Sequence, residues 1–184
     1  SMGGSMGDGA IVAAGSTNSL FDTFIGSDVS TDIWDVHDWA IPSGVYTPTV
    51  SSGAVTLPDG GRLLSNTIFN IPSSSYLTRT LEVVTTFNNA PFQHIGFSDP
   101  SVSKYLLIST KNVTDTLYAR IENGSGEIFF PLGSIPSGPH IYRIEWKDSG
   151  VNDEIGFFID GTQIGATQIV SNTNLTNMNV LLGN

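Results

Sequence analysis

One segment, His140–Gly161, constrains the fold of this chain more than any other. In its first half, large apolar side chains stand at every second position: Tyr142, Ile144 and Trp146. A polar break leads to a second apolar run, Ile155–Ile159, which ends in the dipeptide Asp160-Gly161. A period of two is typical of a strand with one buried face, and Asp-Gly is a strong signal for a hairpin turn. The segment therefore predicts two paired strands whose aromatic face needs a second sheet to cover it.

The rest of the chain supplies strands for that second sheet. Short runs rich in β-branched and aromatic residues recur at intervals of about 8–12 residues, separated by Gly, Pro, Asn and Ser. The main runs are Val45–Val50, Ala54–Leu57, Arg62–Phe69, Tyr76–Phe87, Phe92–Phe97, Tyr105–Thr110, Leu117–Glu122, Glu127–Leu132 and Gln163–Val170. No stretch keeps the 3.6-residue period of an amphipathic helix long enough to matter. The pattern predicts an all-β fold, an antiparallel sandwich of two sheets.

Length and composition narrow the organisation and the partners. With 184 residues the chain has the size of one domain. Residues 1–7 read as an expression-tag remnant, residues 8–19 are expected to form a leader or edge segment, and residues 20–184 the sandwich. The net charge of −10, with only seven Lys and Arg, argues against a nucleic-acid partner. No apolar run approaches the roughly 20 residues of a membrane span, and the absence of cysteine excludes disulfides and thiolate metal sites.

An acidic segment between residues 22 and 38 has two interpretations. It carries five aspartates interleaved with Ile33, Trp34, Val36 and Trp39. The aspartates can satisfy backbone amides of a long loop. Alternatively, some of them bind a structural calcium ion together with backbone carbonyls. The candidate ligands are Asp22, Asp28 and Asp32.

The strand pair at residues 140–161 also carries a family resemblance. The stretches HIYRIEW at 140–146 and FIDG at 158–161 resemble the H-x-Y-x-I-x-W…F-x-D-G pattern of the concanavalin A-like lectin/glucanase superfamily. Similar elements occur at Phe21–Phe24, Gly61–Leu64 and His94–Phe97, so the resemblance spans residues 21–170. It implies a jelly roll of two curved sheets whose concave face binds glycans, as in bacterial non-catalytic LamG-like domains. It further implies an extracellular or cell-surface location and a module of a larger multidomain protein.

The same resemblance allows a test for catalysis. Laminarinase-type members carry an E-x-D-x-x-E strand, and retaining hydrolysis needs two carboxyl groups about 5 Å apart. No glutamate on a predicted strand has such a partner along its own strand. These glutamates are Glu82, Glu122, Glu127 and Glu145. The sequence therefore predicts that the protein is not an enzyme but a carbohydrate-binding, lectin-like domain. The alternatives are a structural or adhesive spacer without a sugar site, and a divergent glycoside hydrolase whose carboxylates converge from separate strands.

The candidate carbohydrate site is on the face opposite the hairpin. If the runs at 92–97, 105–110 and 117–122 form a meander on the concave sheet, their outward positions present aromatic and polar groups suited to a poly- or oligosaccharide. Together with an aromatic of the acidic segment, the candidate binding residues are His94, Tyr105, Tyr118, Arg120, Glu122 and Trp39. The alternative is an ordinary solvated face of an antiparallel sheet.

The end of the chain departs from the families that it resembles. They close the sandwich with a terminal strand containing Asp and Trp, and this chain has none. Three explanations are open. The run Val180–Leu182 replaces that strand, the N-terminal segment fills the edge, or the chain is clipped.

Overall fold

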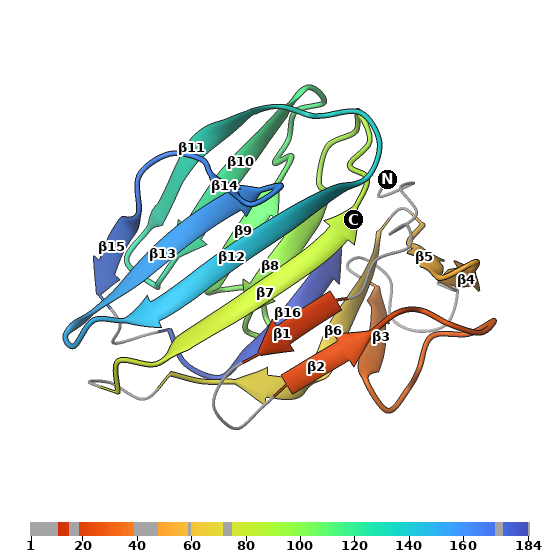
Figure 1. Cartoon of the computed structure of the whole chain (residues 1–184), viewed down its shortest axis with the longest axis horizontal. Coiled ribbons are helices and arrows are strands. Elements are labelled where there is room, and N and C mark those ends of the chain that lie inside the picture. Colours follow the sequence, from red (N-terminus) through yellow and green to blue (C-terminus); the bar gives the residue numbers. More distant parts are fainter. Residues whose placement is uncertain are drawn as a thin grey trace.

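The computed structural model describes residues 11–14, 19–38, 48–58, 60–71, 75–171 and 175–183. Their regular structure is entirely β-strand, and two seven-stranded antiparallel sheets pack face to face (Figure 1). No helix in these ranges has the length and apolar character needed to cross a membrane. The predicted fold class, an antiparallel two-sheet β-sandwich, is confirmed.

Sheet A contains the hairpin at residues 140–161. Its strand order is β14-β13-β12-β7-β1-β2, and β15 also pairs with β13. The strands are β1 (Ile11–Ala14), β2 (Ser19–Asp22), β7 (Thr78–Thr85), β12 (His140–Asp148), β13 (Asn152–Ile159), β14 (Thr162–Gln163) and β15 (Gln168–Ser171). Residues 11–14, which the sequence analysis assigns to a leader or edge segment, lie inside this sheet between β7 and β2.

Sheet B covers the aromatic face of sheet A. Its strand order is β11-β10-β9-β8-β16-β6-β3. The strands are β3 (Trp34–Asp38), β6 (Gly61–Phe69), β8 (His94–Ser98), β9 (Tyr105–Ser109), β10 (Thr116–Glu122), β11 (Glu127–Ser134) and β16 (Met178–Gly183). A separate hairpin joins β4 (Thr49–Ser51) to β5 (Ala54–Thr56).

The run Val180–Leu182 belongs to β16, the last strand of the described residues. Strand β16 lies between β8 and β6 and pairs antiparallel with both, so it occupies the middle of sheet B. Residues around Val180–Leu182 thus form part of a central strand of sheet B, and the N-terminal strand β2 forms one edge of sheet A.

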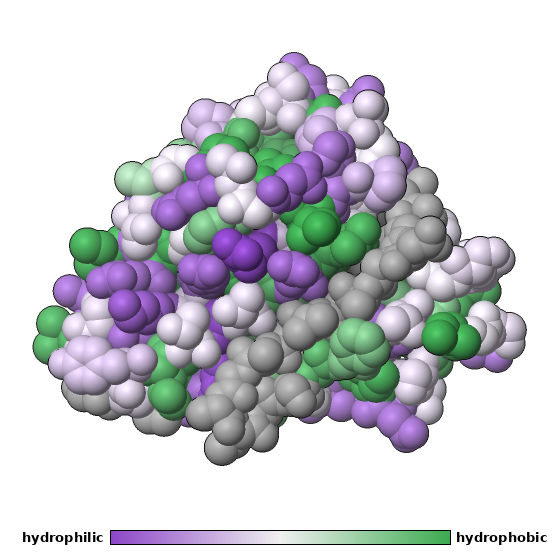
Figure 2. All heavy atoms as spheres, viewed as in Figure 1, coloured by the Kyte–Doolittle hydropathy of each residue, from purple (hydrophilic) through white to green (hydrophobic). Residues whose placement is uncertain are grey.

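The core lies between the two sheets and is built from alternating side chains. Tyr142, Ile144 and Trp146 are buried as the period of two predicts. The Trp146 ring contacts the Phe97 ring edge to face at 5.6 Å, and its indole N–H donates to the buried Asp153 carboxylate at 2.7 Å. This hydrogen bond satisfies a polar atom that would otherwise be costly in the interior. By contrast, polar side chains gather over the middle of the solvent face of sheet A (Figure 2).

The motif at His140 and Asp160-Gly161 has a structural role here. His140 Nδ1 lies 2.6 Å from Asp160 Oδ2, and its Nε2 lies 3.1 Å from the carbonyl oxygen of Ser137. The other oxygen of Asp160 accepts the backbone N–H of Ile141 at 2.9 Å. Asp160 and Gly161 form the turn with positive φ angles of 50° and 81°, the conformation that favours Asp-Gly. The motif therefore clamps the start of β12 to the end of β13.

The clamp makes a pH-dependent contribution to stability. The hydrogen bond with Asp160 raises the pKa of His140, and the same bond lowers the pKa of Asp160. The stabilisation from His140 is complete below its unfolded pKa of about 6.5 and is lost as the pH rises through the higher folded value. The stabilisation from Asp160 is present above its unfolded pKa of about 3.9 and is lost as the pH falls through the lower folded value.

We predict that Asp160→Asn lowers the melting temperature most between about pH 4 and 6.5. Asparagine tolerates the positive φ of this position, so the turn is expected to persist. The measurement is the difference in melting temperature between wild type and variant across pH 4–9, together with an NMR titration of His140. A difference that stays constant from pH 5 to 9 would contradict the clamp.

Candidate functional site

The candidate site lies on the outer face of sheet B, over strands β8 to β11. Ile95, Ile108 and Ala119 point into the core, so the residues next to them on each strand point outward. The strand register arranges the outward side chains in three cross-strand rows: His94, Ser109 and Tyr118; Leu107, Arg120 and Phe129; and Tyr105, Glu122 and Glu127.

The centre of this face is the carboxylate of Glu127. Arg120 donates to Oε2 from Nη2 at 2.6 Å and from Nε at 3.0 Å. The Lys111 ammonium lies 3.2 Å from Oε1, and the Tyr105 hydroxyl donates to Oε2. Lys111, Arg120 and Glu127 have side chains only 18–20% exposed. Charge-assisted bonds of this kind are stronger than neutral ones, so Glu127 fixes the geometry of its three partners.

Protonation states follow from these contacts. Burial opposes ionisation of Glu127, but hydrogen bonds from Tyr105, Arg120 and Lys111 outweigh it, so the pKa of Glu127 lies below its usual value. Burial and the bond to Glu127 raise the pKa of Tyr105 to about 12. At neutral pH the centre therefore holds an anionic Glu127, a neutral phenol and two cations.

His94 and Ser109 continue the network at one side. His94 Nδ1 lies 2.7 Å from Ser109 Oγ. That oxygen already accepts the backbone N–H of Lys111 at 2.8 Å and Arg120 Nη1 at 3.4 Å, so the Ser109 proton is directed to His94. Burial, with a contribution from the charge of Arg120, lowers the pKa of His94 to about 3. His94 is thus neutral and accepts at Nδ1, which leaves its proton on Nε2.

An aromatic pair borders the charged centre. The Tyr118 and Phe129 rings meet edge to face with centroids 6.0 Å apart. The Lys111 ammonium lies 3.2 Å from the centroid of Phe129, a cation–π contact. Phe129 remains 51% exposed. A large exposed apolar ring beside a hydrogen-bonding network is a surface that can interact with a ligand.

The structure brings together four of the six candidate binding residues: His94, Tyr105, Tyr118 and Arg120. Glu122 shares their face, but its Oε1 accepts the backbone N–H groups of Gly124 at 2.7 Å and Gly126 at 3.1 Å. One role of Glu122 is therefore to hold the β10–β11 turn. Trp39 lies outside the described residues. Carbohydrate binding by these side chains stays a prediction.

Sequence reasoning missed the residue at the centre, Glu127, and with it Lys111, Ser109 and Phe129. The sequence contains the information needed to place Glu127 and Phe129. The short turn at residues 123–126 pairs β10 with β11, which places Glu127 opposite Glu122. Glu127 and Phe129 then share the outward face by alternation. Lys111 is harder to place because it follows β9 in a loop and has a positive φ of 52°.

The aspartates proposed for calcium have other contacts in the structure. Asp22 accepts the backbone N–H of Phe24 and the indole N–H of Trp34, each at 2.7 Å. Asp28 accepts the hydroxyl of Ser27 at 3.1 Å. Among the described residues, no three His, Asp or Glu side chains are grouped so that they could hold a metal ion. Trp34 is buried at 1% exposure, so Asp22 connects the start of the acidic segment to the core.

Calcium binding to the acidic segment stays a prediction with a simple test. If the segment binds the ion, EDTA lowers the melting temperature and added calcium restores it, because a ligand that binds only the folded state stabilises it. The measurement is thermal unfolding with EDTA, with calcium and with magnesium as a control. Identical melting temperatures in all three would remove the calcium prediction.

Comparisons with known proteins agree with the fold. No family model matches the chain, and no curated protein matches it significantly. Among solved structures, the chain is similar to an endo-1,3-β-glucanase from Streptomyces sioyaensis, with a TM-score of 0.69 and 16% sequence identity. The match covers 92% of this chain and 84% of the glucanase chain. At this identity the similarity shows the jelly-roll fold shared with that enzyme.

The prediction that the protein is not an enzyme is wrong, because the similar solved structure is itself a glucanase. The E-x-D-x-x-E motif places its carboxylates along one strand, but two carboxylates can also meet from neighbouring strands. Glu122 and Glu127 lie on neighbouring strands and are direct cross-strand partners. Absence of the one-strand motif therefore does not exclude an enzyme.

We predict that Glu127→Ala lowers the free energy of unfolding by about 1–3 kcal/mol, because it removes charge-assisted hydrogen bonds in a mostly buried network. The measurement is urea unfolding at pH 7. Because the folded pKa of Glu127 is lowered, its contribution is present above the unfolded pKa and is lost as the pH falls through the folded value.

The matched control is Glu145→Ala on sheet A. Glu145 also pairs with an arginine, Arg143, at 3.2 Å, but its side chain is 40% exposed. Exposed pairs contribute about 0–1 kcal/mol, so this variant is expected to unfold almost as the wild type does. Equal losses in the two variants would contradict a central role for Glu127.

Proposed function

We propose that the protein binds a polysaccharide on the outer face of sheet B, over strands β8 to β11, and that a β-glucan is the first ligand to test. One observation carries the proposal: the exposed Phe129 ring adjoins a cluster of hydrogen-bonding side chains centred on Glu127. The fold shared with an endo-1,3-β-glucanase supports it. The extracellular location and the multidomain context stay predictions.

The chemistry of this face fits a saccharide. A sugar ring has an apolar face that packs against an aromatic ring and a rim of hydroxyls that both donate and accept. Phe129 and Tyr118 offer the aromatic surface. Arg120 and Lys111 supply donors, and Glu127 supplies acceptor oxygens. Because these groups already hold one another in place, little side-chain entropy is lost on binding.

Glycoside hydrolysis is a second candidate function, favoured by the Glu122–Glu127 pair. The two residues are directly opposed on antiparallel strands, where Cβ atoms lie about 4.5–5.5 Å apart. Retaining glycosidases need two carboxyl groups about 5–5.5 Å apart. The lowered pKa of Glu127 suits the ionised nucleophile of such a pair. Glu122 is the second carboxyl group of this candidate pair.

The binding proposal predicts that Phe129→Ala and Arg120→Ala each weaken binding of laminarin, a soluble β-1,3-glucan, by about tenfold or more, equivalent to about 1.4 kcal/mol. Isothermal titration calorimetry measures the affinity. Phe158→Ala is the matched control, because Phe158 also lies beside a cation, with the Arg143 guanidinium 4.1 Å from its ring, but on sheet A. No binding of laminarin or of a wider glycan panel at millimolar concentration would overturn the proposal.

Hydrolysis is tested in the same preparation by the release of reducing ends from the polysaccharide. If the Glu122–Glu127 pair acts as a catalytic dyad, Glu127→Gln and Glu122→Gln each abolish the release. Activity that survives both substitutions would show that other residues catalyse the hydrolysis. Wild-type protein that binds laminarin without cleaving it would rule out this second candidate function.

A further inference from the structure

A second apolar cluster lies on the outer face of sheet B, separate from the main core. Its buried members are Leu64 on β6, Leu107 on β9 and Leu181 on β16, with exposures of 4%, 1% and 0%. Val102 and Tyr105 pack against them. Leucines that point away from the core of a sandwich are normally exposed, so the segment that carries Val102 covers this part of the face.

The covering segment is the connection between β8 and β9, residues 99–104, here called the β8–β9 loop. Asp99 holds it in one conformation. One carboxylate oxygen accepts the N–H groups of Ser103 at 2.7 Å and Lys104 at 2.9 Å. The other accepts the hydroxyls of Ser101 and Ser103, each at 2.7 Å. These hydrogen bonds, together with the packing of Val102 on the leucines, fix the β8–β9 loop against the outer face of sheet B.

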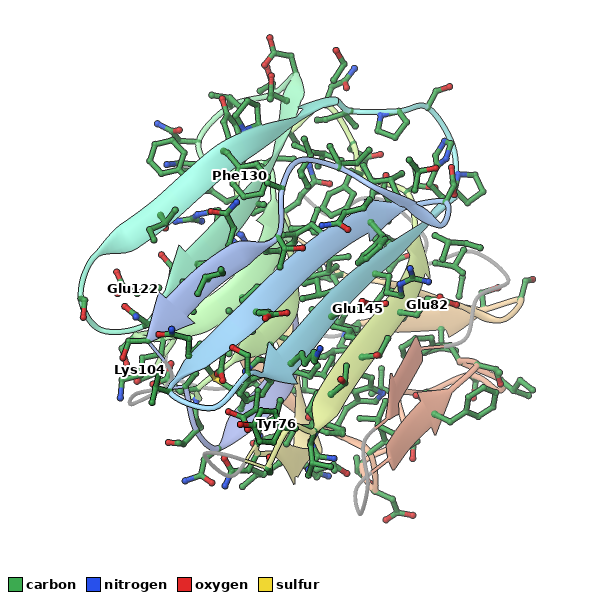
Figure 3. All side chains as sticks on the ribbon, turned by 60° about the vertical axis from the view of Figure 1, so that its left-hand side comes forward. Tyr76, Glu82, Lys104, Glu122, Phe130 and Glu145 are labelled. Carbon is green, nitrogen blue, oxygen red and sulfur yellow. The ribbon has the colours of Figure 1, made fainter. Side chains whose placement is uncertain are left out.

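The outer face of sheet B is therefore divided into a closed and an open part. At the closed part, all six residues of β16 are buried. At the open part, the side chains of β10 and β11 that form the proposed site remain partly or largely exposed. Lys104, at the end of the β8–β9 loop, lies near Glu122 at the edge of the open part (Figure 3).

Tyr105 is the boundary between the two parts. Its ring packs against the leucine cluster under the loop, and its hydroxyl donates to Glu127 at the centre of the proposed site. The loop thus begins where the site ends. A saccharide that runs along the row of Phe129 and Arg120 meets Leu107 and Leu181, on which Val102 of the β8–β9 loop packs, and this loop blocks its path over β16.

We infer that the site binds the end of a saccharide chain, or a short oligosaccharide, rather than the interior of a long chain. This inference rests on the proposed function and specifies its ligand. Strands β9 to β11 span roughly 10 Å at the usual strand spacing, which is room for about two or three sugar rings. Beyond that length, additional sugars extend into solvent and contribute no contacts.

The test compares the binding of linear and cyclic glucans. Linear β-1,3-gluco-oligosaccharides of increasing length and a cyclic β-glucan, which has no chain end, are titrated into the native protein by calorimetry. We expect affinity to rise up to about three sugars and then to change less than twofold, with no detectable binding of the cyclic glucan. Equal affinity for linear and cyclic glucans, or a tenfold gain beyond about five sugars, would overturn the inference and leave the proposed function intact. Failure of every saccharide to bind would instead overturn the proposed function.

A variant tests whether the β8–β9 loop limits the length of saccharide that the site contacts. Asp99→Ala removes the four hydrogen bonds that hold residues 99–104. In this variant we expect affinity to keep rising with chain length, with oligosaccharides longer than three sugars bound at least threefold more tightly than the trisaccharide. Asp115→Ala is the control, because Asp115 is an exposed aspartate in the next loop whose carboxylate accepts the hydroxyl of the neighbouring Thr116 at 3.0 Å. An unchanged length dependence in Asp99→Ala, with wild-type circular dichroism, would show that this loop does not limit the chain.

Discussion

The packing of two aromatic layers against each other determines both faces of sheet B. Trp146 on sheet A contacts Phe97 on sheet B at a centroid distance of 5.6 Å, and Phe157 on sheet A contacts Phe130 on sheet B at 5.9 Å. Burying Phe97 fixes which side of β8 faces inward, and alternation then leaves His94 on the outer face. A shift of one residue in the register of β8 would turn its inward-facing side chains outward and its outward-facing side chains inward. The core that makes the chain fold therefore also sets the orientation of the groups in the proposed site.

The charged network is unusual for the chain that carries it. The protein has a net charge of −10 and seven basic residues, yet two of those seven converge on a single carboxylate, Glu127. A mostly buried network of this kind is weak evidence for stabilisation, because desolvation offsets much of the attraction. The network instead orders the face: Arg120 on β10 contacts Glu127 on β11 and both Tyr105 and Ser109 on β9, and so fixes groups on three strands relative to one another.

Local pattern predicted the strands, the buried aromatic face and four of the outward site residues, because a period of two depends only on neighbouring positions. It could not place β16 in the middle of sheet B or β1 beside β7, since those pairings join residues far apart in the chain. Glu127 was missed for a related reason: its importance depends on hairpin register and on Lys111 in a different loop. The exclusion of an enzyme failed because it considered carboxylates on one strand only.

The position of β16 also has a consequence for folding order. In the strand pairing of the described residues, β3 and β6 on one side of sheet B are hydrogen-bonded to β8–β11 on the other side through β16 alone. Both groups precede β16 in the chain, so sheet B is two separate pieces until the last strand inserts between them. Its contact between Leu181 and Leu64 closes a loop of more than a hundred residues, and contacts of such high sequence separation form slowly. During synthesis on the ribosome, completion of the sheet must wait for residues 178–183 to emerge.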